Sequence, residues 1–347
     1  MKLKNLYYGW IIVVIGVFVL MIQALPIYTF GIFLRPLTME FNWDRGALSG
    51  AYSMFALING LLFIPRGRLS DKYGPRILVT ISGLLYGIGF LLMSLVNSLW
   101  QVYIIFGLLM GIGGGCLYIA VTSTIPRWFA KSRGVAVGLT VTGTGIGGIT
   151  SALLAQWLIS SYGWQQAYLI LGLITVIIII PAAQFMKHSP QRAGLRPYGE
   201  DITIEDKQPS DSPTGELFFN QVIKTGRFWL LGSIVFCDFF VVQVIITHIV
   251  PHAVDTGISA MVAASILSII CAISLIGRSL IGFVCDRIGT KLTLTAFLVI
   301  ITVTLIWLLF AKETWMFYVF AVIFGFAPGG IFPIATLIVT NFLVSPL

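Results

Sequence analysis

Charge is scarce in this 347-residue chain, since only 10% of its residues are Asp, Glu, Lys or Arg. A soluble domain carries about 25% charged residues. The charges are also clustered, because residues 77–126 and 134–186 contain none, while 58% of the whole chain is hydrophobic. A bilayer-spanning helix needs roughly 20 apolar residues, so each of these runs is long enough for two spans. The composition excludes a soluble enzyme and predicts a multi-pass membrane protein.

Residues suited to metal or redox chemistry are also few. The four cysteines lie scattered in apolar segments, without metal-ligand spacing: Cys116, Cys237, Cys271 and Cys285. His248 and His252 are four residues apart and close to Asp255, a spacing that suits a metal, a pH sensor or simply polar residues at the membrane interface. No G-x-x-x-x-G-K-[ST] phosphate-binding motif occurs. We therefore expect no metal, no cofactor and no ATP hydrolysis.

The apolar segments predict ten membrane-spanning helices and hence an all-α membrane protein. Lipid offers no partners to backbone groups, and the segments lack the alternating polarity of barrel strands. The predicted spans are 9–33, 46–65, 77–97, 100–122, 134–158, 164–186, 228–250, 258–284, 292–311 and 314–338. A polar, proline-containing stretch at 187–226 predicts a cytoplasmic linker between a six-helix bundle (1–186) and a four-helix bundle (227–347).

The formal net charge of +8 follows the expected membrane topology rather than indicating a nucleic-acid partner. With the N-terminus inside, 17 of the 21 Lys and Arg residues fall on the cytoplasmic side, as the positive-inside rule requires. Arg35, Arg45 and Lys312 fall outside, and Arg278 falls within a span. Two lysines precede a full-length first span without a cleavage site, so we expect that span to stay in place. The predicted location is the inner cell membrane.

A short charged turn occurs twice, after the second span of each predicted bundle. Residues 67–76 (GRLSDKYGPR) match residues 282–291 (GFVCDRIGTK) at two glycines, one aspartate and two basic positions. The matching residues are Gly67, Asp71, Lys72, Gly74 and Arg76 in the first copy and Gly282, Asp286, Arg287, Gly289 and Lys291 in the second. A charged turn repeated at matching places in a membrane chain indicates an internally duplicated transporter.

These turns resemble the signature of the major facilitator superfamily, and the resemblance covers nearly the whole chain. Residues 7–10 (YYGW), 127–134 (RWFAKSRG) and 247–253 (THIVPHA) are similar to its oxalate/formate antiporter and monocarboxylate porter branch. The resemblance implies two six-helix bundles around a central cavity, alternating access, cytoplasmic gating by the charged turns, and a monomer. The superfamily normally has twelve spans, so the last two helices are absent; the sequence is either a fragment or a natural short form.

Arg278 is the strongest candidate for binding the substrate. A charged residue at such depth costs roughly 2.5–3.5 kcal/mol on insertion scales, and the guanidinium group suits a carboxylate. The branch carries an arginine on this helix that binds the substrate anion, and Arg278 matches it by context. Asp238 lies at similar depth on the preceding helix and is a candidate charge partner or proton carrier. The alternatives are a snorkelling arginine and a fixed structural ion pair.

Three further residues are candidates for shaping the substrate site. Tyr118 corresponds to a cavity tyrosine of the branch, although a tyrosine at the membrane interface is the alternative. Gln23 and Tyr28 lie on the first span, but a spacing of five puts them on different faces, so at most one points straight at the substrate. Ser274 and Ile27 stand where animal proton-linked porters carry an acid and a lysine, which argues against proton symport of that kind and leaves anion exchange or a different proton site open.

The sequence as a whole predicts a secondary transporter of small organic anions, of the monocarboxylate or oxalate/formate type. It works either as an antiporter or with protons. Two alternatives remain open: a transporter of a drug or neutral metabolite on the same fold, and a truncated membrane protein that transports nothing.

Overall fold

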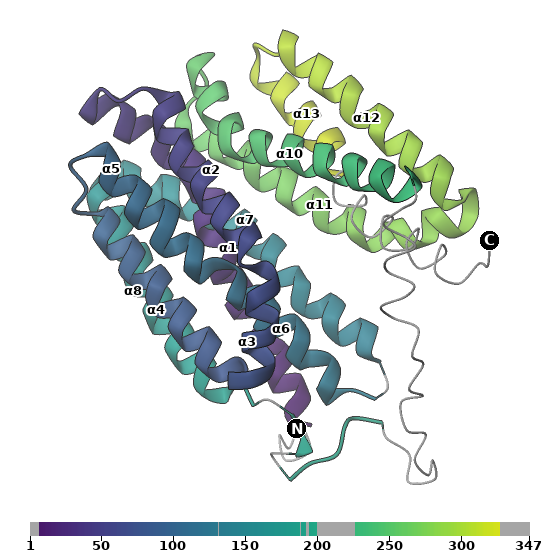
Figure 1. Cartoon of the computed structure of the whole chain (residues 1–347). Coiled ribbons are helices and arrows are strands. Elements are labelled where there is room, and N and C mark those ends of the chain that lie inside the picture. The colour runs from purple at the N-terminus through teal and green to yellow at the C-terminus, as the bar shows by residue number, and fades with distance from the viewer. Residues whose placement is uncertain (1–6, 131, 188, 192–193, 200–225, 327–347) are drawn as a thin grey trace, which may run out of the picture. The chain divides into compact units, whose positions relative to one another are not determined.

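The computed structural model describes residues 7–130, 132–187, 189–191, 194–199 and 226–326. These residues are almost entirely helical (Figure 1), apart from an isolated parallel β-bridge between Phe129 and Tyr198. The helices are α1 (Tyr8–Phe41), α2 (Arg45–Leu61), α3 (Phe63–Tyr73), α4 (Pro75–Met93), α5 (Leu99–Val102), a π-helical segment (Tyr103–Met110), α6 (Gly111–Trp128), α7 (Arg133–Tyr162), α8 (Trp164–Phe185), α10 (Gly226–Asp255), α11 (Ala260–Ile288), α12 (Thr290–Phe310) and α13 (Thr314–Phe326).

Eight helical segments in the described part of the chain are long and apolar enough to cross a membrane. They correspond to eight of the ten predicted spans, and the prediction of an all-α membrane protein is confirmed. The second predicted span, 46–65, is divided at Leu62 into α2 and α3. The tenth, 314–338, is described only as the shorter apolar helix α13, because residues 327–338 lie outside the described residues.

Local chemistry explains where α2 begins and where it stops. Asp44 caps its N-terminus by accepting a hydrogen bond from the backbone N–H of Ala47 at 2.9 Å, the usual role of an aspartate at this position. Pro65 lies in the first turn of α3 and has no N–H, so the carbonyl group of Leu61 lacks its helical donor. The helix therefore breaks at Leu62, and α3 continues to Tyr73.

The described helices belong to two compact units that do not follow the chain order. The first unit contains residues 1–200 and 247–268, and the second contains residues 201–246 and 269–347. The adjoining ends of α10 and α11 therefore belong to the first unit. Within it, the hydroxyl of Ser268 donates to the carbonyl of Ile149 on α7 at 3.0 Å, which ties the start of α11 to that helix.

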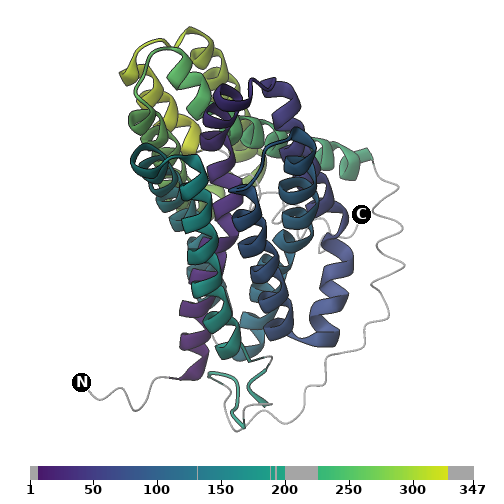
Figure 2. The same cartoon turned by 90° about the vertical axis from the view of Figure 1, so that its left-hand side faces the viewer.

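Pairs of closely packed helices form the first unit. The most extensive contacts join α1 to α7 and α4 to α8. The α4–α8 pair lies side by side in Figure 1, and Figure 2 shows the same helices turned by 90°. Glycines permit this approach: a methyl group on Gly83 would overlap Ile179, and one on Gly143 would overlap the backbone of Val17. Small residues at helix crossings are the usual means of close packing in membranes.

Exchanging Gly143 for Ala should destabilise the first unit. The added methyl group would collide with the carbonyl group of Val17 on α1, and overpacking of this kind costs about 1–3 kcal/mol. The matched control is Gly138→Ala on the same helix, where nothing lies within 4 Å of the added carbon; removing a helical glycine there should stabilise by up to about 1 kcal/mol. Thermal unfolding of both purified variants would test this, and equal unfolding temperatures would contradict the α1–α7 contact.

The second unit places α12 beside α13. The indole N–H of Trp307 donates to the carbonyl of Met316 at 3.1 Å, closing the turn between these helices. Gly277 on α11 lies against the backbone of Phe326 on α13, so the chain immediately before Arg278 is in close contact with that helix.

Candidate functional site

A buried cation lies within the first unit. Arg66, on α3, is 3% exposed. One guanidinium nitrogen donates to the backbone carbonyl and the side-chain oxygen of Asn59 at 3.0 and 2.8 Å, and the other donates to the carbonyls of Gly111 and Ile112 at 2.6 and 2.7 Å. Among the described residues no carboxylate forms an ion pair with it. All four acceptor atoms are therefore uncharged.

The glycine-rich start of α6 makes room for this cluster. A methyl group on Gly115 would overlap the Arg66 guanidinium, and one on Gly114 would lie 2.5 Å from the Tyr86 hydroxyl. Within the described structure the Nε atom of Arg66 and the hydroxyl of Tyr86 are buried without a hydrogen-bond partner. Buried polar groups are nearly always paired, and these two atoms are exceptions. The cluster therefore has unused hydrogen-bonding capacity beside the positive charge of Arg66.

The sequence does not reveal the buried position of Arg66. The predicted partition of charges counts it as cytoplasmic, because it follows the span predicted at 46–65, and that partition carries no information about its burial. The helix break at Leu62 turns the chain into a further helix that runs on for seven residues beyond Arg66. Pro65 and the glycines of α6 are the sequence signals that, taken together, indicate the break and the space.

The predicted charge pair of the second unit is only partly visible. Arg278 lies on α11, but its side chain is outside the described residues. Asp238 lies on α10 and is half-buried, and within the described part of the chain its Oδ1 atom is buried without a hydrogen-bond partner. The pairing of these two residues therefore stays a prediction.

The other predicted substrate residues lie in the first unit. Gln23 and Tyr28 are on α1 and Tyr118 is on α6, and all three are half-buried. The hydroxyl of Thr122 donates to the backbone carbonyl of Tyr118 at 2.8 Å. The two helices pack against each other, so the three candidates belong to neighbouring elements.

The two copies of the charged turn share one backbone conformation. Gly74 has φ 80° and ψ 164° and precedes α4, while Gly289 has φ 83° and ψ 150° and precedes α12. A positive φ favours glycine strongly, which explains the repeated residue at this position. Lys72 lies over the ring of Tyr73 at 5.3 Å, Arg76 donates to the side-chain oxygen of Gln184, and Arg287 is exposed.

The surroundings of five residues of this motif lie outside what the structure describes. These residues are Gly67, Asp71, Gly282, Asp286 and Lys291.

A two-pronged ion pair lies at the opposite end of the first unit. Both terminal nitrogens of Arg45, at the start of α2, donate to the carboxylate of Asp255, the last residue of α10. The hydrogen bond to this carboxylate raises the pKa of Arg45. Each side chain is 43% exposed, so the pair contributes at most about 1 kcal/mol. His248 is half-buried and His252 exposed on the same stretch of α10.

Two sequence stretches singled out by the family resemblance meet in one aromatic cluster. The ring of Tyr7 packs against Trp128, Phe129 and Tyr198 with centroid distances of 6.1, 6.1 and 5.3 Å. Its hydroxyl donates to the carbonyls of Trp128 and Arg196 at 3.0 and 2.7 Å. The backbone of Tyr198 bonds to Trp128 and Ala130. These contacts hold residues 196–198, which follow α8, against the start of α1 and the end of α6.

Comparison with known proteins identifies relatives over most of the chain. Monocarboxylate transporter 13 of Rattus norvegicus is 26% identical over 332 residues, which are 94% of this chain and 73% of the relative. The oxalate:formate antiporter of Oxalobacter formigenes is 27% identical over 286 residues, 82% of this chain. The chain spans 65% of the length of that antiporter.

Solved structures share the fold at low sequence identity. A bacterial homologue of the human lysosomal transporter Spinster has a TM-score of 0.76 at 17% identity, covering 99% of this chain and 76% of its own. A D-xylose–proton symporter has a TM-score of 0.70 at 15% identity, covering 96% of this chain and 83% of its own. The family model of the Major Facilitator Superfamily matches residues 16–345. The chain belongs to the Major Facilitator Superfamily.

Proposed function

We propose that this protein is a secondary transporter of small organic anions, of the monocarboxylate or oxalate/formate type, that works by alternating access. The observation that carries the proposal is the similarity, over 82–94% of the chain, to transporters named for these anions. The energy comes from a gradient of a second anion or of protons.

Arg278 is the residue that we expect to anchor the substrate carboxylate. It is the one arginine within a predicted span of the second bundle, and its helix is described around it. A guanidinium group binds a carboxylate through two parallel hydrogen bonds. Tyr118 and one of Gln23 and Tyr28 would complete the pocket by donating hydrogen bonds to the anion.

Two other charged groups support an anionic cargo and its coupling. Arg66 has no ion-pair partner among the described residues, and its charge raises the electrostatic potential within the first unit, which favours anions over cations. Asp238 has a buried carboxylate oxygen without a partner among the described residues, as expected for a group that exchanges a proton or a charge partner during transport.

We further propose that the N-terminus lies in the cytoplasm of a cell whose inner membrane holds the protein as a monomer. The domain limits are 1–186 and 227–347 for the two bundles, with 187–226 as the linker. The repeated charged turns then lie at the cytoplasmic face, where their basic residues obey the positive-inside rule and hold the inner side closed when the outer side is open.

Uptake by reconstituted vesicles tests this function. Vesicles containing the full chain should accumulate labelled oxalate, formate or lactate above protein-free vesicles. Dependence on unlabelled anion inside the vesicles would identify exchange, and stimulation by an acidic exterior would identify proton coupling. Absence of uptake for all three anions, together with uptake of a neutral metabolite, would reject the anion proposal in favour of another cargo on the same fold.

A further inference from the structure

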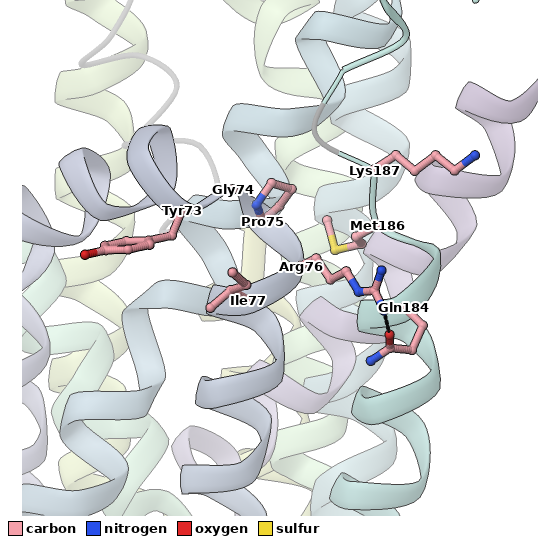
Figure 3. Close-up of a pocket in the computed structure, with 8 residues that line it drawn as sticks. All are labelled: Tyr73, Gly74, Pro75, Arg76, Ile77, Gln184, Met186 and Lys187. Carbon is pink, nitrogen blue, oxygen red and sulfur yellow. Dashed lines mark hydrogen bonds between the residues drawn. The ribbon is translucent and has the colours of Figure 1, made fainter. Parts of the chain in front are cut away.

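A pocket of about 360 Å³ opens between the α3–α4 turn and the end of α8. Residues 73–77 form one side, and Gln184, Met186 and Lys187 form the other (Figure 3). It lies in the first unit, at the end of the bundle that carries the first charged turn. The substrate residues proposed above do not line this pocket.

The pocket is basic. Arg76 is exposed, and the one described hydrogen bond of its guanidinium is to the neutral side chain of Gln184, drawn as a dashed line in Figure 3. Lys187 also lines the pocket, but its ammonium group lies over the ring of Tyr8 at 4.7 Å and points away from Arg76 (Figure 3). None of the lining residues is acidic. The positive charge of Arg76 therefore borders the pocket without a counter-charge in the pocket's described lining, while the ammonium group of Lys187 lies further out, over Tyr8.

Helix α4 reinforces this positive field. It begins at Pro75, on the wall of the pocket, and has no acidic residue in its first turn. The N-terminus of a helix carries a partial positive charge. Together with Arg76, this end of α4 favours an anion with several oxygen acceptors.

An apolar, exposed stripe leads away from the pocket along the same helix. Ile77, Ile81, Leu84 and Ile88 follow one another at helical spacing and are 48%, 52%, 36% and 44% exposed. From Ile77 to Ile88 the helix rises about 16 Å, close to half of the roughly 30 Å hydrocarbon core of a bilayer. A ligand that fits both features has an anionic head and an apolar chain as long as one leaflet is deep.

We propose that this pocket binds the phosphate group of an acidic phospholipid, with an acyl chain lying along the α4 stripe. Arg76 is the main ligand of the phosphate, and the more distant charge of Lys187 adds to the positive field around the pocket. Basic pockets between helices at the cytoplasmic face are suited to acidic headgroups, so the inference rests on the proposed orientation for the leaflet that supplies the lipid. The bound lipid joins the first charged turn to the end of α8.

Lipid binding by the full chain tests the proposal without any transport assay. Native mass spectrometry and thermal unfolding would compare phosphatidylglycerol with phosphatidylcholine in the wild type, Arg76→Gln, Lys187→Gln and Lys72→Gln. We expect phosphatidylglycerol to bind preferentially to the wild type. Arg76→Gln should weaken that binding by about fivefold, the effect of one basic residue at a membrane surface. Lys187→Gln should have a smaller effect. Lys72→Gln, with equal charge loss on the same turn but outside the pocket lining, should bind as the wild type does.

Several outcomes would overturn the inference. Equal binding of the two lipids, or wild-type phosphatidylglycerol binding by Arg76→Gln, would remove the site. Equal stabilisation by inorganic phosphate at the same concentration would identify a free anion as the occupant instead of a lipid. Should Arg76→Gln fail to fold, Arg76→Lys serves in its place, because it keeps the positive charge but loses the paired N–H donors of the guanidinium. Undiminished phosphatidylglycerol binding by both Arg76→Lys and Lys187→Gln would reject the pocket. Because none of these measurements involves uptake, a failed anion-transport assay would leave the lipid result interpretable.

Discussion

Replacing Arg278 by Gln is expected to lower carboxylate uptake by about 100-fold, because truncating one partner of a buried, hydrogen-bonded charge pair costs 2–5 kcal/mol or more. Glutamine keeps a polar side chain but is shorter and loses the charge and the paired donors. Uptake by Arg278→Lys should lie between that of the wild type and that of Arg278→Gln. An ammonium group keeps the positive charge but lacks the paired N–H donors that bind both carboxylate oxygens.

Initial rates of labelled oxalate, formate and lactate uptake, normalised to the amount of folded protein in the vesicles, would measure this effect. Lys312→Gln is the control: it removes one positive charge from an exposed residue between α12 and α13 and should leave uptake unchanged. Wild-type uptake by Arg278→Gln would reject this residue as the anion anchor, while membership of the superfamily would stand.

Replacing Arg66 by Met should lower the free energy of unfolding by about 2–4 kcal/mol, since hydrogen bonds to charged groups contribute about 1.5–3 kcal/mol each before the cost of burying the charge is subtracted. The guanidinium makes four such bonds, two to Asn59 and two to carbonyl groups of α6. Methionine retains most of the apolar stem of arginine but cannot make these four hydrogen bonds. The break between α2 and α3 then loses its link to α6.

Thermal unfolding of the purified chain in one detergent would measure the change. Lys72→Met, six residues further along α3 and exposed, is the matched control and should change the unfolding free energy by less than about 0.5 kcal/mol. An unfolding temperature of Arg66→Met equal to that of the wild type would mean that burial of the charge costs as much as its four bonds contribute, and would remove Arg66 as the structural link.

The relation between Arg66 and Arg278 shows how far sequence reasoning extends in a membrane protein. Both are arginines next to glycine-containing helix segments. Arg278 stands out because its predicted span continues on either side of it, whereas Arg66 follows a proline near the end of a predicted span. The burial of Arg66 depends on the glycines of α6, which begins 45 residues further along the chain. A hydropathy pattern carries no information about that contact.

The repeated turn is the opposite case. Its glycine, aspartate and basic residues can be recognised in the sequence, and the conformations of Gly74 and Gly289 follow from local sterics alone. The pocket beside the first copy cannot be recognised in this way, because Gln184 and Lys187 approach Arg76 from more than 100 residues away. The Arg45–Asp255 pair, 210 residues apart, is equally invisible in the sequence.

The amino-acid sequence by itself determines the all-helical membrane fold, the approximate spans and the internal duplication, because lipid forces every apolar segment to satisfy its own backbone hydrogen bonds. That constraint acts locally and leaves a pattern in each segment. The tertiary structure decides which polar side chains are buried, which glycines admit them and which charges share a pocket. These features depend on contacts between helices distant in the chain, where side-chain packing rather than hydropathy selects the neighbours.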